Sequence, residues 1–108
     1  MMIATWNVNS VRTRLPHLLS FLQEEKPDIV LLQEIKCIDE QFPRMEIEEL
    51  GYNIATHGQK TYNGVAILSK LPLNNRSCMS VAKSDHKRHI CAELPDGTAL
   101  HNFYIPAG

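Results

Sequence analysis

The sequence lacks the marks of several protein classes. No apolar run approaches the roughly 18 residues that a membrane-spanning helix needs. Residues 1–6 have neither the basic start nor the long apolar core of a secretory signal. The three cysteines are odd in number and form no CxxC pair, so neither a disulfide framework nor a cysteine zinc site is expected. The chain has no repeats, low-complexity tracts or linkers, so no internal domain boundary is expected, and the expected location is the cytoplasm with no membrane association.

Neither positive nor negative charge is in excess. Eleven basic and twelve acidic residues give a net charge of −1, so the chain as a whole does not attract nucleic acid. A DNA partner would have to be held by a local basic patch. With 108 residues, 44% of them hydrophobic, the chain can bury a core.

The first third of the sequence predicts a strand, a helix and a second strand. Residues 3–7 are apolar and β-branched, then turn abruptly polar. Apolar residues next recur at helical spacing up to Leu22, and Pro16 places the helix start near Thr13 or Arg14. Residues 24–27 end the helix at a proline. Residues 28–34 form a continuous apolar run, typical of a strand buried on both faces, so the two strands are expected to run parallel.

The remainder predicts one more helix and several short strands. Residues 39–50 favour a polar helix whose start is complicated by Pro43. Four strands follow, at residues 52–56, 65–69, 89–94 and 99–105. A tight turn at 95–98 joins the last two as a hairpin. The fold class is therefore α/β with parallel and antiparallel strands. Because the sequence stops directly after a strand, the domain is expected to be incomplete on its C-terminal side.

Two polar side chains follow the predicted parallel strands. Asn7 ends the first strand and Glu34 ends the second. Sites in α/β sheets form where the carboxyl ends of strands meet, so these side chains are expected to converge. Carboxylate and amide oxygens suit a hard cation such as Mg²⁺, which can polarise a phosphoryl oxygen. Either residue could equally be a solvated strand terminus.

Three further residues are candidates for contact with phosphate. Tyr104 lies near the end of the last strand, where its hydroxyl could bond a phosphate or simply face water above a buried ring. Lys60 and Arg88 lie in polar segments that could meet a DNA backbone, or could be ordinary solvated surface.

Four sequence blocks together resemble one family. They are Thr5-Trp6-Asn7-Val8-Asn9-Ser10-Val11-Arg12, the LQE-x-K run at 32–36, Tyr62-Asn63-Gly64-Val65-Ala66-Ile67-Leu68-Ser69-Lys70, and Tyr104-Ile105-Pro106-Ala107-Gly108. In this order and spacing they are similar to the endonuclease/exonuclease/phosphatase family, over the whole chain. The segment 57–60 resembles the exonuclease III branch in particular. Ile35 and Ser10 depart from that pattern, where threonine and glycine are common.

The resemblance implies a four-layer α/β sandwich with two central mixed sheets, of which residues 1–108 are the amino-terminal part. It implies a DNA repair nuclease that removes nucleotides from 3′ ends of duplex DNA and incises beside abasic sites with Mg²⁺ or Mn²⁺. Glu34 would bind the metal, and Asn7 would support the metal or the scissile phosphate. Tyr104 would bond the reacting phosphate. Arg88, Lys60 and Asn9 would bind the substrate.

The resemblance also implies an incomplete site, because the family's later acid, base and metal groups would follow residue 108. This chain alone is therefore expected to be inactive, with the missing C-terminal half as its partner and a monomer as the complete form. Three alternatives remain open. The chain could act on lipid or inositol phosphates within the same family, bind nucleic acid without cleavage, or be one structural half of a split protein.

Overall fold

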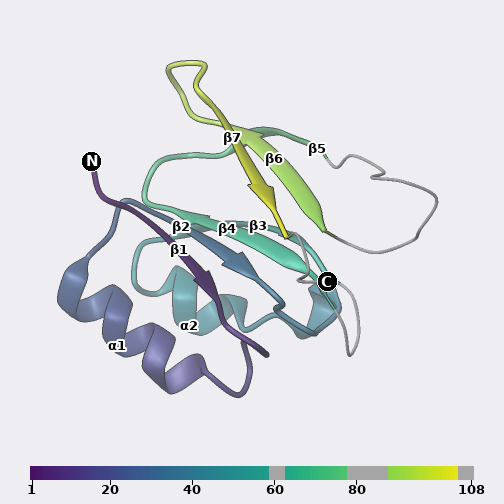
Figure 1. Cartoon of the computed structure of the whole chain (residues 1–108). Coiled ribbons are helices and arrows are strands. Elements are labelled where there is room, and N and C mark those ends of the chain that lie inside the picture. Colours follow the sequence, from purple (N-terminus) through teal and green to yellow (C-terminus); the bar gives the residue numbers. More distant parts are fainter. Residues whose placement is uncertain (59–62, 78–87, 105–108) are drawn as a thin grey trace.

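The structure, a computed structural model, describes residues 1–58, 63–77 and 88–104. Two stacked β-sheets form its centre, and two helices cover the outer face of one of them (Figure 1). Sheet A has the strand order β1-β2-β4-β3, and sheet B has the order β5-β6-β7. The strands are β1 (Ile3–Asn7), β2 (Ile29–Gln33), β3 (Asn53–His57), β4 (Val65–Ser69), β5 (Asn74–Ser77), β6 (His89–Glu93) and β7 (Ala99–Phe103). No helix in the described ranges is long and apolar enough to cross a membrane.

The predicted strand-helix-strand unit is confirmed. β1 and β2 run parallel, with Asn7 opposite Gln33. Helix α1 (Leu15–Glu25) joins them, beginning one or two residues beyond the predicted start at Thr13 or Arg14. It ends because Lys26 turns left-handed, with φ +47°, while its N–H still bonds the Leu22 carbonyl at 3.2 Å. Pro27 then prevents continuation. The short connection brings the chain back beside β1 and aligns the ends of the two strands.

The single helix predicted over residues 39–50 is wrong. The segment instead holds a 3₁₀ turn at Asp39–Gln41 and the short helix α2 (Arg44–Glu48). Between them Phe42 is extended, with φ −64° and ψ 134°. The cause is Pro43, whose ring disfavours helical backbone at the residue before it.

Sheet B contains the predicted hairpin and one strand that the sequence did not indicate. β6 and β7 are antiparallel across the turn at 95–98, where Gly97 has φ +90° and the Thr98 N–H donates to the Asp96 carboxylate at 2.9 Å. The unpredicted strand is β5, whose four residues are polar and exposed. It forms because it can pair with the edge of β6, in an irregular register.

Two apolar layers hold the fold together. One lies between sheet A and the helices, and the other lies between the sheets. Strand β4 is buried along its whole length because it faces both layers. The residues of the inter-sheet layer are Ile29, Ala55, Val65, Ile67, Leu73, Ile90, Ala92, Leu94 and Leu100. The predicted α/β class with two sheets is confirmed: sheet A is mixed, and the described strands of sheet B are antiparallel.

Candidate active site

The ends of β1 and β2 place Asn7 beside Glu34, as the sequence predicted. The Val8 N–H bonds the Gln33 carbonyl at 3.0 Å, which extends the pairing past the strands. The Asn7 side-chain amide donates to the Glu34 carboxylate through Nδ2. The Asn7 oxygen instead accepts the Asn9 N–H at 3.2 Å. Asn7 thus contacts the carboxylate through its nitrogen and fixes where that carboxylate points.

Tyr104 reaches the same carboxylate from the other sheet. It follows β7, and its N–H continues the hairpin ladder by bonding the Arg88 carbonyl at 2.8 Å. Its hydroxyl faces the Glu34 carboxylate, which acts on it through charge and hydrogen bonding. Burial, followed by the charge of Glu34 and this hydrogen bond, raises the pKa of Tyr104, and the nearby Arg88 guanidinium partly opposes the rise. The phenol therefore stays protonated and remains a donor at neutral pH.

Lys36 is a member of the cluster that sequence reasoning missed. Its Nζ lies 3.7 Å from Glu34 Oε1 and donates to the Asn9 side-chain oxygen. The side chains of Lys36 and Glu34 are 29% and 21% exposed, so solvent reaches this pair. The spacing of two between Glu34 and Lys36 gave no usable signal, because both residues follow β2 and have left-handed backbone. Asn9, predicted to bind substrate, is joined to the cluster through Lys36.

The remaining predicted residues lie at the border of this cluster or outside the described part. Arg88 precedes β6, and its Nε lies 3.5 Å from the Asn63 side-chain oxygen. Asn63 is 8% exposed, and sequence reasoning did not name it as a site residue. Lys60 lies outside the described residues, so its predicted contact with duplex has no structural counterpart here.

Left-handed backbone is concentrated around these side chains. Residues with positive φ in this region are Asn9, Ser10, Glu34, Lys36, Asn63 and Gly64. Such conformations are costly for residues other than glycine and persist only where neighbours enforce them. Here the loops enforce one another: Ser10 N–H bonds the Glu34 carbonyl at 2.8 Å, and Lys36 N–H bonds the Asn63 carbonyl at 3.0 Å. Because its backbone turns at φ +54°, Glu34 leaves the strand geometry and presents its carboxylate at the end of the sheet.

The side chains of this cluster supply some of the oxygen ligands that a hard cation needs. Mg²⁺ is commonly held by one or two carboxylates together with water and phosphate oxygens, and Glu34 supplies one partly exposed carboxylate. Within the described ranges, no group of three or more histidine, cysteine or acidic side chains is arranged around a common point. The arrangement can therefore orient one carboxylate and one phenol beside two cationic side chains, a chemistry suited to phosphate.

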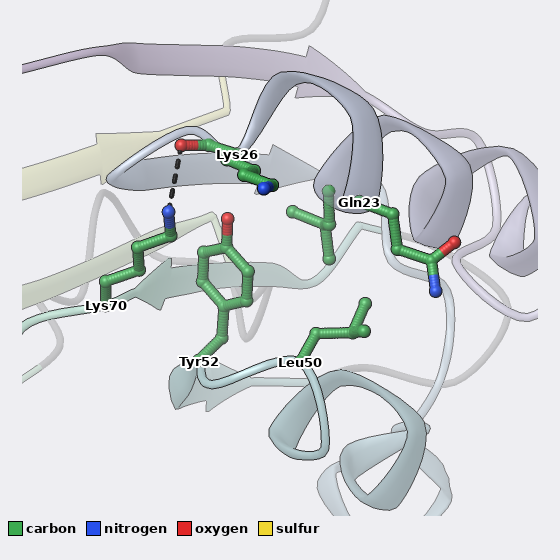
Figure 2. Close-up of a pocket in the computed structure, with 6 residues that line it drawn as sticks. Gln23, Lys26, Leu50, Tyr52 and Lys70 are labelled. Atoms are coloured by element: carbon green, nitrogen blue, oxygen red, sulfur yellow. Dashed lines mark hydrogen bonds between the residues drawn. The ribbon is translucent and has the colours of Figure 1, made fainter.

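A separate pocket lies at the opposite end of β2 (Figure 2). Its volume is about 220 Å³, and it is lined by Leu22, Gln23, Lys26, Leu50, Tyr52 and Lys70. Lys70 follows β4 there, and its Nζ donates to the Lys26 carbonyl at 3.1 Å. The Lys70 N–H bonds the Asp28 carbonyl, at the start of β2, whereas Glu34 follows the end of that strand. This pocket is therefore not part of the cluster around Glu34.

Several known proteins are similar to this chain in sequence or in fold. Exodeoxyribonuclease III of Haemophilus influenzae is 36% identical over 113 residues, which cover all of this chain and 42% of that protein. A solved AP endonuclease from Archaeoglobus fulgidus aligns with a TM-score of 0.90 and 37% identity, over 98% of this chain and 41% of that one. A 3′ phosphatase from Neisseria, solved with a product DNA hairpin, aligns with a TM-score of 0.89 and 38% identity, over 96% of this chain and 41% of that one.

The chain thus spans about two fifths of the length of these relatives. The model of the Endonuclease/Exonuclease/phosphatase family matches residues 4–106, nearly the whole sequence. The match includes the strands and loops that carry Asn7, Glu34 and Tyr104. The chain belongs to the endonuclease/exonuclease/phosphatase family.

Proposed function

We propose that this chain is the amino-terminal part of a Mg²⁺-dependent DNA nuclease of the exonuclease III type. Its substrate would be duplex DNA, cut beside abasic sites and shortened from 3′ ends during repair. The observation that supports the proposal most directly is the convergence of Asn7 and Tyr104 on one carboxylate, Glu34. The Archaeoglobus and Neisseria relatives, an AP endonuclease and a 3′ phosphatase bound to a DNA hairpin, support DNA as the substrate class.

In this proposal Glu34 holds the cation, Mg²⁺ or alternatively Mn²⁺. When bound, a divalent cation polarises a phosphoryl oxygen and stabilises the charge that develops on it. Asn7 orients the carboxylate from β1, and would contact the metal directly only with its amide reversed. The left-handed backbone at Glu34 holds the carboxylate at the sheet end before any substrate arrives.

The phenol and the cationic side chains would receive the phosphate. Tyr104 remains a hydrogen-bond donor at neutral pH because its pKa is raised, so it can donate to an oxygen of the reacting phosphate. Arg88 would contact the DNA backbone beside it, and Asn9 and Lys36 would bind phosphate from the β1 side. The segment with Lys60 would lie along the duplex.

No general base is assigned among the residues that the structure describes, so activity is expected to depend on residues from the rest of a larger domain. Removing members of a catalytic unit usually lowers the rate by several orders of magnitude. We therefore expect the 108-residue chain to be inactive alone and to form a monomeric enzyme with the remaining C-terminal portion. Action on a lipid or inositol phosphate by the same site is a weaker alternative, since the relatives named here act on DNA.

The test is incision of a duplex with one abasic site, with Mg²⁺ and with a chelator. It would be run on the chain alone, on the chain joined to the downstream portion of a relative, and on Glu34→Gln versions of both. Mg²⁺-dependent cutting that the substitution abolishes would support the proposal. Cutting that survives Glu34→Gln, or that proceeds equally in chelator, would contradict it. If the joined form cuts DNA and the 108-residue chain alone does not, the chain carries only part of the active site.

A further inference from the structure

A buried polar link joins the two sheets directly beneath the candidate active site. Asn102 lies on β7 and is only 1% exposed. Its Nδ2 donates to the Leu32 carbonyl and to the Ala66 carbonyl, each at 2.8 Å, on the two central strands of sheet A. Its Oδ1 accepts a hydrogen bond from Gln33 Nε2 at 2.9 Å. Both donors and the acceptor of this amide are thus engaged, as burial of an amide requires.

This link has one possible orientation. Reversing the amide would set its oxygen against two carbonyl oxygens and its nitrogen against the Gln33 donor. The hydrogen bonds therefore fix Asn102 in rotation as well as in position. Gln33 is held in turn by Thr5 Oγ1 on β1, 2.9 Å away. Two strands of sheet A thus contact the Asn102 side chain directly, and β1 is joined to it through Gln33.

The position of the link along the strands connects it to the site. Asn102 precedes Tyr104 by two residues and so lies on the same face of β7. Leu32 precedes Glu34 by two residues on β2. The link therefore joins β7 and β2 two residues before the phenol of Tyr104 and the carboxylate of Glu34. In the described part of the chain the Glu34 carboxylate is contacted by Asn7, Lys36 and Tyr104, none of which belongs to the link, so the effect of the link on that carboxylate is indirect.

The rest of the layer between the sheets gives little directional control. The buried side chains of this layer are aliphatic. Their attraction scales with buried area and has no preferred direction. Another polar contact between the sheets joins His57 Nδ1 to the His89 carbonyl at 3.1 Å, between β3 and β6. It lies across β4 from β2 and does not bear on the strand that carries Glu34.

We propose that Asn102 is a positioning residue for this site. Together with Gln33 it fixes the end of β7 against the end of β2. It thereby sets where the Tyr104 hydroxyl meets the Glu34 carboxylate. The consequence for catalysis rests on the function proposed above, whereas the consequence for geometry does not.

The geometric test needs no activity and can be made on the 108-residue chain. The reporter is the Asn7 side-chain amide resonance in a ¹⁵N–¹H spectrum, since that group donates to Glu34. The variant is Asn102→Ala, and the matched control is Leu100→Ala. Leu100 also faces the inter-sheet layer from β7 but makes no side-chain hydrogen bond. We expect the Asn7 amide and the Tyr104 ring signals to move in Asn102→Ala and to stay in Leu100→Ala.

Unchanged Asn7 and Tyr104 signals in a folded Asn102→Ala protein would overturn the proposal. If that variant does not fold, Gln33→Met removes one bond of the link and leaves the two carbonyl bonds. It should then move the same signals by a smaller amount, and their persistence would overturn the proposal equally.

The kinetic test uses whichever form cuts the abasic duplex. Misplacing a reacting group by about 1 Å can cost up to ~100-fold in rate. We expect Asn102→Ala to lower kcat by about 10- to 100-fold with KM nearly unchanged, while Leu100→Ala keeps kcat within about twofold at full folding. Equal losses of kcat in both variants would reduce Asn102 to a stability role. If no form cuts DNA, the proposed function fails and the spectroscopic result alone decides the positioning.

Discussion

A tyrosine, a carboxylate and a lysine lie together at each end of β2, but they have different partners at the two ends. At its start, Tyr52 lies near Asp28, and Lys70 lies 6.0 Å above the Tyr52 ring. At its end, Tyr104 lies near Glu34, with Lys36 on the other side. Burial first, and the neighbouring carboxylate second, raises the pKa of each tyrosine.

The difference lies in the partners of these groups. The Tyr52 hydroxyl donates to the Pro27 carbonyl at 2.6 Å, and Tyr52 is only 3% exposed. Asp28 accepts a backbone N–H, from Met2. Glu34, in contrast, is contacted by side chains within the described residues, and solvent reaches it. Backbone partners tie the start of β2 into the fold, whereas side-chain partners leave the other end able to exchange them for a ligand.

The largest expected effect separates the two carboxylates. Glu34→Gln should lower Mg²⁺-dependent incision by about 10³-fold or more in the active form, since it removes the only carboxylate assigned to the metal. Asp28→Asn should change incision by less than about threefold, because the amide oxygen can still accept the Met2 N–H. Initial rates at saturating Mg²⁺ measure both. A comparable loss in the two variants would contradict the assignment of the site to the end of β2.

Substitution of Tyr104 should affect activity, whereas substitution of Tyr52 should affect stability. Tyr104→Phe removes a donor that faces the phosphate site, so kcat should fall by about 10- to 100-fold with little change in the free energy of unfolding. Tyr52→Phe removes a buried hydrogen bond and should cost about 1–2 kcal/mol of stability without loss of incision. Urea unfolding and incision kinetics on both variants give the comparison. The reverse pattern would mean that the assigned roles are exchanged.

Alkaline pH should weaken the fold through the tyrosine at the start of β2. The pKa of Tyr52 is raised above its ordinary value of 10.0, so the unfolded chain loses this proton first. The contribution of Tyr52 to the unfolding free energy should therefore be constant below about pH 10 and be lost as pH rises from there through the raised pKa of the folded state. The slope above pH 10 should be smaller in Tyr52→Phe, measured by urea unfolding at several pH values. An unchanged slope would show that another group carries the alkaline transition.

The meeting of Asn7 with Glu34 was predictable because it depends on local pattern. A helix between two apolar strands gives parallel pairing, and parallel pairing places the residues after each strand at one sheet edge. Tyr104 could be named from the family's motif, but its contact with Glu34 depends on how sheet B rests on sheet A. That contact joins positions 70 residues apart, and no local periodicity encodes it.

Two of the features that were missed, β5 and the contacts of Asn102, share this non-local origin, whereas the divided helix has a local cause. The strand β5 consists of polar residues with little intrinsic preference for strands, and it exists because β6 offers an edge. The sequence around Asn102 does not indicate its role, because its hydrogen-bond partners lie on β2 and β4, far away in the chain. Pro43 was recognised as a difficulty, but its effect on Phe42 was large enough to divide the predicted helix.

The smallest expected effect concerns the two lysines. Lys36→Met and Lys70→Met should each change the unfolding free energy by no more than about 0.5–1 kcal/mol, because partly exposed charges contribute little to stability. Duplex binding should separate them. A lysine that contacts phosphate adds about one unit to the slope of log K against log salt, so Lys36→Met should lower that slope by about one and Lys70→Met should leave it unchanged. Fluorescence anisotropy with a labelled abasic duplex between low and moderate salt measures the slopes. Equal slopes in wild type and Lys36→Met would place the DNA backbone away from Lys36 and leave Arg88 as the nearer cationic contact.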